Sequence, residues 1–287
     1  MTPLILPPGR AATPFIDPGN PDRPLVIESY RPAAHGPDDP VVLVQHGMKR
    51  NGDDYRDFWI EAAERHRLLI VAPTFSDAHY PEAESYNNGL VFAADGAVRP
   101  AASWSYAAIP RVFAALRAAG LTRRERFHLF GHSAGGQFVH RLMQTTLLGV
   151  VEQAISGNAG WYSLPTLERP FAEGLGGLGL DEAQLRRALA APLTILAGTA
   201  DNDPNGENLP RNEAAMRQGP TRYARALHFM EFAKEAARRL GVDCAWRLVE
   251  IEGVGHDGRA MSIAAAAWWF EGRVLRAADI AGVEANA

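Results

Sequence analysis

The chain has 287 residues, of which 47% are hydrophobic and 22% are charged, and both fractions are close to those of soluble globular proteins. This composition excludes a disordered chain and a fibrous repeat. The formal net charge of -4 at pH 7 provides no global positive field for phosphate backbones, so nucleic acid is not an expected partner.

Cysteine content and hydropathy exclude further classes of protein. Cys244 is the only cysteine, so neither an intramolecular disulfide nor a cysteine-based zinc site is possible. Residues 1–24 lack a charged segment followed by a long apolar one, and no run of about 18 apolar residues occurs in the sequence. We therefore expect a cytoplasmic protein with no membrane partner.

Short apolar segments bounded by turn residues recur along the chain and are predicted as strands. They read PLVIESY, VVLVQHG, LLIVAPT, FHLFGHS, EQAISGN, LTILAGT and AWRLVEI. Helices are predicted between them, over residues 54–66, 105–119, 134–146, 181–190, 223–240 and 259–273. Several strands are too uniformly apolar for a half-exposed sheet, so the alternation predicts one α/β domain over 1–287. Its sheet should be mostly parallel and doubly wound, with helices on both faces.

Two longer segments interrupt this alternation. Residues 164–191 contain FAEGLGGLGL and one short helical pattern, and residues 202–221 are polar and contain three prolines. Long connections in a compact domain are commonly binding loops or lids. We therefore expect a lid insertion at 164–191 that covers the active site, and a long polar loop at 202–221.

The strongest local motif is G-x-S-x-G at residues 131–135, centred on Ser133. It lies between a predicted apolar strand and a predicted helix. A strand that turns abruptly into a helix places the central serine in strained geometry, and Gly131 and Gly135 remove side chains that would collide across that turn. Ser133 is therefore the predicted nucleophile.

With this motif in its strand–turn–helix context, the sequence resembles the α/β-hydrolase superfamily over about residues 25–270. The resemblance implies a triad in the chain order serine, acid, histidine. Asp201 follows the predicted strand LTILAGT, and His256 follows RLVEIEGVG. His256 would take the proton of Ser133 as the serine attacks a carbonyl, while Asp201 would fix the imidazole tautomer.

Asp203 is the alternative acid, because it lies two residues beyond Asp201 in ADNDPNGEN. The same residues also match the first half of a calcium loop. Position twelve of that loop falls on Asn212 instead of a glutamate, and a strand precedes it instead of a helix, so a metal is not expected.

The superfamily resemblance also implies an oxyanion hole made by the backbone N–H groups of Met48 and Ala134, with His46 supporting the loop. HGMKRNGDDYRDFW around Met48 and AGTAD around the acid resemble the polyhydroxybutyrate-depolymerase and feruloyl-esterase branch. Trp104, Trp161 and Tyr162 are candidates for the walls of the substrate pocket.

These features predict a serine hydrolase that cleaves a small-molecule carboxylic ester through an acyl-serine intermediate, with no cofactor. An amidase or peptidase on the same triad is one alternative, because the first step is chemically similar. The other is a binding protein that keeps the fold without the chemistry. Dehalogenase and epoxide-hydrolase chemistry would need an aspartate where Ser133 stands.

Overall fold

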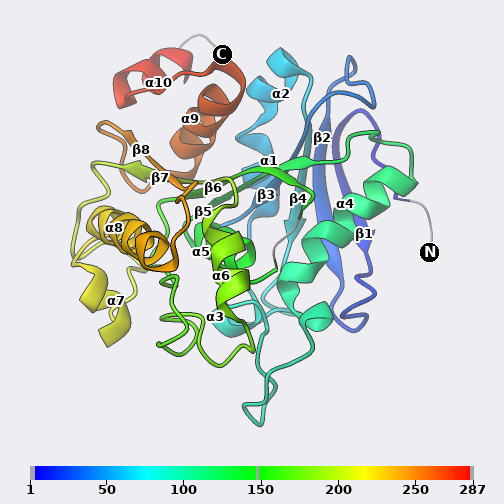
Figure 1. Cartoon of the computed structure of the whole chain (residues 1–287). Coiled ribbons are helices and arrows are strands. Elements are labelled where there is room, and N and C mark those ends of the chain that lie inside the picture. The colour runs from blue at the N-terminus through cyan, green and yellow to red at the C-terminus, as the bar shows by residue number, and fades with distance from the viewer. Residues whose placement is uncertain (1–3, 147–148, 285–287) are drawn as a thin grey trace.

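The computed structural model describes residues 4–146 and 149–284 and contains one eight-stranded sheet. Its strands lie side by side in the order β1-β2-β4-β3-β5-β6-β7-β8 (Figure 1). Their bounds are β1 (Gly9–Phe15), β2 (Leu25–Arg31), β3 (Val41–Gln45), β4 (Leu69–Thr74), β5 (Phe127–His132), β6 (Val151–Gly157), β7 (Leu193–Gly198) and β8 (Arg247–Ile251).

The strands from β4 to β8 in this order are parallel, while β1 and β2 pair antiparallel at one edge. The predicted α/β fold with a mostly parallel sheet is therefore confirmed. All seven predicted strands are present. The eighth strand of the sheet, β1, was not predicted from the sequence. Its residues GRAATPF are mostly small or polar; the first six alternate between half-buried and exposed, and only Phe15 is buried, because an edge strand needs little apolar surface.

Helices cover both faces of the sheet (Figure 1). One face packs against α4, α5, α6 and α8, and the other packs against α1, α2, α9 and α10. The helix bounds are α1 (Gly52–Asp57), α2 (Ile60–His66), α3 (Glu82–Ser85), α4 (Ala108–Ala118), α5 (Ala134–Thr145), α6 (Glu182–Leu189), α7 (Glu213–Gln218), α8 (Arg222–Leu240), α9 (Gly258–Glu271) and α10 (Ala277–Glu284).

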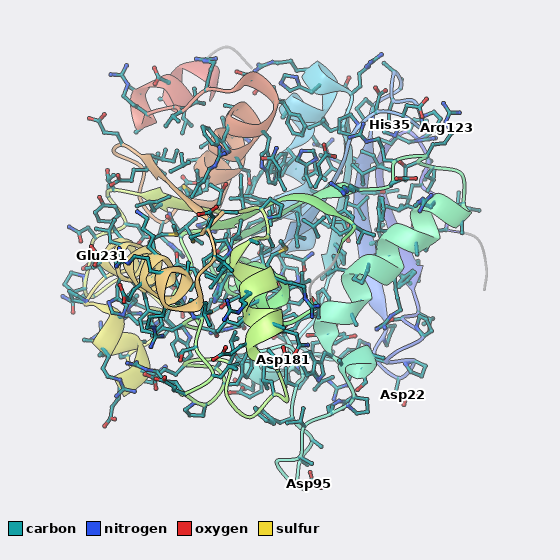
Figure 2. The ribbon with its side chains drawn as sticks, viewed as in Figure 1. Asp22, His35, Asp95, Arg123, Asp181 and Glu231 are labelled. Carbon is teal, nitrogen blue, oxygen red and sulfur yellow. The ribbon has the colours of Figure 1, made fainter. Side chains whose placement is uncertain are left out.

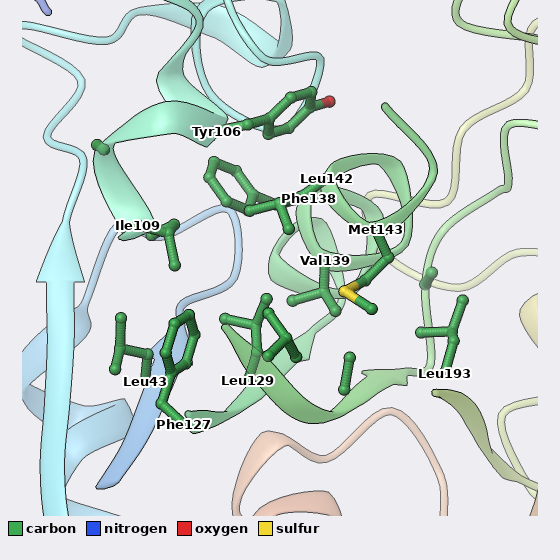
Figure 3. Close-up of a cluster of buried hydrophobic side chains, with 14 of the residues drawn as sticks. Leu43, Tyr106, Ile109, Phe127, Leu129, Phe138, Val139, Leu142, Met143 and Leu193 are labelled. Atoms are coloured by element: carbon green, nitrogen blue, oxygen red, sulfur yellow. The ribbon is translucent and has the colours of Figure 1, made fainter. Parts of the chain in front are cut away.

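The core on the α5 face is built from the apolar stripe of that helix and the strands beneath it. Figure 3 shows Phe138, Val139, Leu142 and Met143 of α5 above Leu129 of β5. All five side chains are buried, and Val139 also lies against Gly131 in the turn at which β5 becomes α5. This packing holds the start of α5 rigidly against the sheet.

One predicted helix and one predicted loop needed correction. The helix expected over 54–66 is divided into α1 and α2, because Phe58 and Trp59 interrupt it. The polar loop expected at 202–221 contains α7, whose first turn is capped by Asn212 through Ala215 N at 2.9 Å. The capping signal is a single asparagine among several polar residues, so apolar periodicity did not reveal this short helix. α3 and α10 were also not predicted from the sequence.

Several charged side chains lie at the surface of the molecule. Figure 2 shows Asp95, Arg123 and Glu231 at its outer edge, where each is exposed. Within the described ranges, no helix is both long and apolar enough to span a bilayer. The carboxyl ends of the parallel strands meet at one edge of the sheet, so the loops that follow β3, β5, β7 and β8 can converge there.

Candidate active site

Ser133 occupies the sharp turn between β5 and α5. Its backbone is strained, with φ 58° and ψ -117°. A Cβ on Gly131 would overlap the main-chain oxygen of Gly135, and a Cβ on Gly135 would overlap that of Gln45. The turn therefore requires glycine at both positions, for the steric reason that the motif predicts.

Three loops bring the predicted nucleophile, base and acid together. His256 Nε2 lies 3.0 Å from Ser133 Oγ, and His256 Nδ1 lies 2.7 Å from Asp201 Oδ2. Asp201 follows β7 and is only 5% exposed, and its second oxygen lies 3.5 Å from Arg222 at the start of α8. A carboxylate that is held at both oxygens can fix the orientation and tautomer of the imidazole.

Asp203, the alternative acid, lies elsewhere. Its side chain is exposed and accepts a hydrogen bond from Asn205 N at 2.8 Å, within its own loop. Among the residues that the structure describes, no group of three or more acidic, histidine or cysteine side chains could hold a metal ion. Asp201, and not Asp203, is therefore the carboxylate that is hydrogen-bonded to His256.

Met48 and Ala134, the predicted oxyanion donors, both line the cavity that opens beside Ser133. The loop that carries Met48 is held by His46, which is fully buried. The His46 ring bonds Gly47 O through Nδ1 at 2.9 Å and accepts from Phe75 N through Nε2 at 3.0 Å. Burial lowers the pKa of His46 to about 3, and its two ring contacts link the loop to the backbone that follows β4.

A second contact joins the same loop to the serine turn, and the sequence did not reveal it. Tyr55 of α1 bonds His132 Nδ1 through its hydroxyl at 2.7 Å. A Cβ on Gly47 would lie 3.0 Å from that hydroxyl oxygen, and a Cβ on Gly258 would lie 2.8 Å from it. The buried ring of His132 lies 4.7 Å from the ring of His256 between centroids. Tyr55 therefore lies where the loop that carries Met48, the turn at Ser133 and the loop that carries His256 meet.

Asn158, directly after β6, links the acid and histidine loops. Its side-chain oxygen accepts from Gly198 N, and its amide donates to Gly255 O, each at 2.8 Å. Gly198 ends the strand that precedes Asp201, and Gly255 precedes His256. An asparagine after a buried strand is the only sequence signal for this residue, and it does not indicate either partner.

The cavity beside Ser133 has a volume of about 710 Å³. Trp161 lines it, but Trp104 and Tyr162 do not. Trp104 is 2% exposed and donates from its indole to Arg99 O at 2.8 Å. Tyr162 is fully buried and stacks on Phe229 with ring centroids 4.5 Å apart. The expectation that Trp104 and Tyr162 line the pocket is therefore wrong, because both side chains turn into the core.

The described residues that line this cavity include none from 164–191. The walls come instead from residues 82–88 in and after α3, and from residues 208–212 before α7. The expectation that 164–191 covers the nucleophile is therefore not met in this structure. The segment packs its leucines, including Leu164 and Leu175, into the core on the α5 face.

Comparison with known proteins gives close matches among solved structures. No family model matches the chain, and no curated protein matches it. Among solved structures, the chain is 52% identical to LpqC, poly(3-hydroxybutyrate) depolymerase from Bordetella parapertussis, with a TM-score of 0.93 over 96% of this chain and 95% of the other. It is 35% identical to poly(aspartic acid) hydrolase-1 from Sphingomonas sp. KT-1, with a TM-score of 0.88 over 91% of this chain and 98% of the other.

A more distant match shares only the fold. The S-formylglutathione hydrolase from Agrobacterium tumefaciens is 18% identical over 90% of this chain and 91% of the other, with a TM-score of 0.58. The fold and the close matches define a serine hydrolase of the α/β-hydrolase superfamily. Within it, the chain belongs to the branch that includes LpqC.

Proposed function

We propose that the protein hydrolyses carboxylic esters through an acyl-serine intermediate on Ser133. The observation that carries this proposal is the hydrogen-bonded chain from Ser133 Oγ to His256 Nε2, at 3.0 Å, and from His256 Nδ1 to Asp201 Oδ2, at 2.7 Å. This arrangement can activate a serine hydroxyl that is otherwise a weak nucleophile. The similarity to LpqC and to esterase-type hydrolases supports an ester as the substrate.

In the first step, Ser133 Oγ attacks the ester carbonyl carbon and its proton passes to His256 Nε2. The carbonyl oxygen becomes an oxyanion, for which the backbone N–H groups of Met48 and Ala134 are the proposed donors. The bond from carbon to the alcohol oxygen then breaks, and His256 returns its proton to the leaving alcohol. Asp201 orients the imidazole and stabilises its protonated form.

In the second step, water attacks the acyl-serine and gives its proton to His256 Nε2. The carbon–Oγ bond breaks, the proton returns to Ser133, and the carboxylic acid leaves. Both steps use only groups of this chain and water. Bond formation, bond cleavage and proton transfer therefore balance without a cofactor.

An amide substrate is the second candidate. Poly(aspartic acid), which the hydrolase from Sphingomonas acts on by name, is joined by amide bonds, and that protein is 35% identical to this chain. The same triad can cleave an amide when His256 delivers its proton to a leaving nitrogen.

The test is a series of aryl esters graded in acyl length, assayed beside anilides of the same acids. The proposal predicts turnover of esters at rates far above those of the matched anilides, and none by Ser133→Ala. Faster turnover of the anilides would favour the amidase. Turnover of neither series, by a protein whose circular dichroism shows it to be folded, would overturn the proposal.

A further inference from the structure

A second cavity, of about 500 Å³, lies at the edge of the sheet opposite to the one that carries Ser133. Residues at the amino-terminal ends of β6, β7 and β8 line it, together with Trp268 of α9. β7 has six residues and rises about 3.3 Å per residue, so its two ends lie about 17 Å apart. No described residue lines both cavities. The second cavity is therefore separate from the catalytic one, and its size suits a small molecule.

Three polar side chains share one side of this cavity. The sheet register pairs Thr194 with Arg247 on β8 and with Ile155 on β6, and Gln153 lies two residues before Ile155. Ile155 belongs to the core on the α9 face. Because successive side chains of a strand point to opposite faces, Gln153, Thr194 and Arg247 all lie on that face. Trp268 of α9 is half-buried and lines the same cavity (Figure 1).

The protein itself does not use these three polar groups. Within residues 4–146 and 149–284, no hydrogen bond or ion pair engages the Arg247 guanidinium, the Gln153 carboxamide or the Thr194 hydroxyl. Thr194 is only 7% exposed, and it lines the cavity, so its accessible part faces the cavity. A cation, a carboxamide and a hydroxyl are therefore available to a ligand.

The charges around the cavity favour a ligand with one negative charge. Among the described residues, Glu152 and Arg247 are the charged ones that line it, and Glu152 is paired with Arg124 at 2.8 Å. His128 lies opposite Gln153 in the register, and burial lowers the pKa of His128 to about 4, so its ring is neutral at pH 7. The charge of Arg247 is thus uncompensated. A phosphate monoester, with a charge of about -1.5 to -2 at pH 7, would exceed this balance and would also face Glu152.

The shapes of the lining groups narrow the ligand further. A guanidinium is a planar fork that binds a carboxylate through two parallel hydrogen bonds. Trp268 offers a flat apolar surface, and Pro192 and Leu193 extend the apolar lining. A carboxylate attached to a flat apolar body uses both kinds of surface.

We propose that this cavity binds an aromatic monocarboxylate, with its carboxylate on Arg247 and its ring against Trp268. The Thr194 hydroxyl and the Gln153 carboxamide are further donors to the carboxylate. The inference goes beyond the proposed hydrolysis at Ser133 and uses none of the residues of that site.

Benzophenone-4-carboxylate is a suitable probe, because it is an aromatic monocarboxylate that bonds covalently to nearby C–H groups on irradiation. Its neutral amide, 4-benzoylbenzamide, and the dianionic 4-benzoylphenyl phosphate keep the ring system and change the charge. Calorimetry measures the affinity of the wild-type protein for each compound. We expect the carboxylate to bind at least about 10-fold more tightly than the amide, the size of a hydrogen bond to a charged group, and more tightly than the phosphate.

Arg247→Gln is the informative variant, because it removes the cation from an exposed position at the start of β8. It should weaken binding of the carboxylate by about 10- to 100-fold and change binding of the amide little. Thr194→Val keeps the shape of the side chain without its hydroxyl and should weaken binding of the carboxylate about threefold. Arg117→Gln is the matched control, since Arg117 is an exposed arginine of α4; it should keep the wild-type affinity. Circular dichroism checks that each variant is folded.

Peptide mass spectrometry after irradiation locates the bound probe. The adducts should map to residues 152–153, 190–194, 245–247 or 268 and should be lost from Arg247→Gln but not from Arg117→Gln.

Four outcomes overturn the proposal. They are no binding of the carboxylate by the wild type, an unchanged affinity in Arg247→Gln, an amide or phosphate that binds as tightly as the carboxylate, and adducts on residues 82–88 or 208–212 of the catalytic cavity. None of these measurements depends on ester turnover, so failure of this site and failure of the proposed function are distinguishable.

Discussion

Replacing Asp201 by asparagine keeps the shape of the side chain but changes what it can donate. Arg222 can only donate hydrogen bonds, and it lies 3.5 Å from Asp201 Oδ1, so it holds the amide oxygen of the new side chain. The NH2 group then faces His256 Nδ1 and donates to it. His256 consequently carries its proton on Nε2 and has no lone pair there for the proton of Ser133.

The expected loss in kcat is about 10⁴-fold, the size associated with a triad held in the wrong tautomer. This corresponds to about 5 kcal/mol in the activation barrier. Asp203→Asn is the matched control, since it makes the same change two residues away on an exposed side chain whose oxygen bonds Asn205 N. It should change kcat by less than about twofold.

The assay is the initial rate on one aryl ester, measured for both variants after circular dichroism shows that each is folded. A large loss in Asp203→Asn would refute the assignment of the acid. So would an Asp201→Asn variant that is folded and keeps most of its activity.

Three further changes have defined outcomes. Gly135→Ala should abolish ester turnover and lower the thermal midpoint, because its Cβ would overlap the main-chain oxygen of Gln45; a fully active variant would contradict the steric account of the turn. Tyr55→Phe should lower kcat more than it changes KM, since it removes the hydroxyl bonded to His132; a change in KM alone would argue against a positioning role. Burial lowers the pKa of His128 from 6.5 to about 4, so the unfolded chain binds the extra proton between these values and stability falls as pH drops. Between pH 7 and pH 5, the free energy of unfolding measured in urea should therefore fall by about 2 kcal/mol more in the wild type than in His128→Gln. Equal falls in the two proteins would refute this expectation.

Local sequence signals predicted most of the fold, because buried parallel strands are uniformly apolar and the helices between them show a regular apolar stripe. β1 was not predicted because an exposed edge strand lacks the uniformly apolar sequence of a buried strand. α7 was not predicted because a helix of six residues with one capping asparagine shows almost no apolar periodicity.

The residues of the candidate site were also predicted only in part. Ser133 was predicted from its motif between a strand and a helix, whereas Asp201 and His256 were predicted because the resemblance to the α/β-hydrolase superfamily implies an acid and a histidine after later strands, with Asp203 as the alternative acid. Tyr55 and Asn158 contact residues far away in the sequence, and no local sequence pattern indicates such contacts. Trp104 and Tyr162 were misplaced because the sequence places each of them in a loop but does not give the direction of the side chain.

Covalent labelling by a fluorophosphonate tests the central claim most directly, because the probe reacts with a serine that a neighbouring base has activated. Intact-mass and peptide mass spectrometry of the treated protein should show one adduct per chain, on the peptide that contains Ser133. The adduct should be absent from Ser133→Ala and should form far more slowly in His256→Ala. Labelling that persists in Ser133→Ala, or that maps to another residue, would contradict the account.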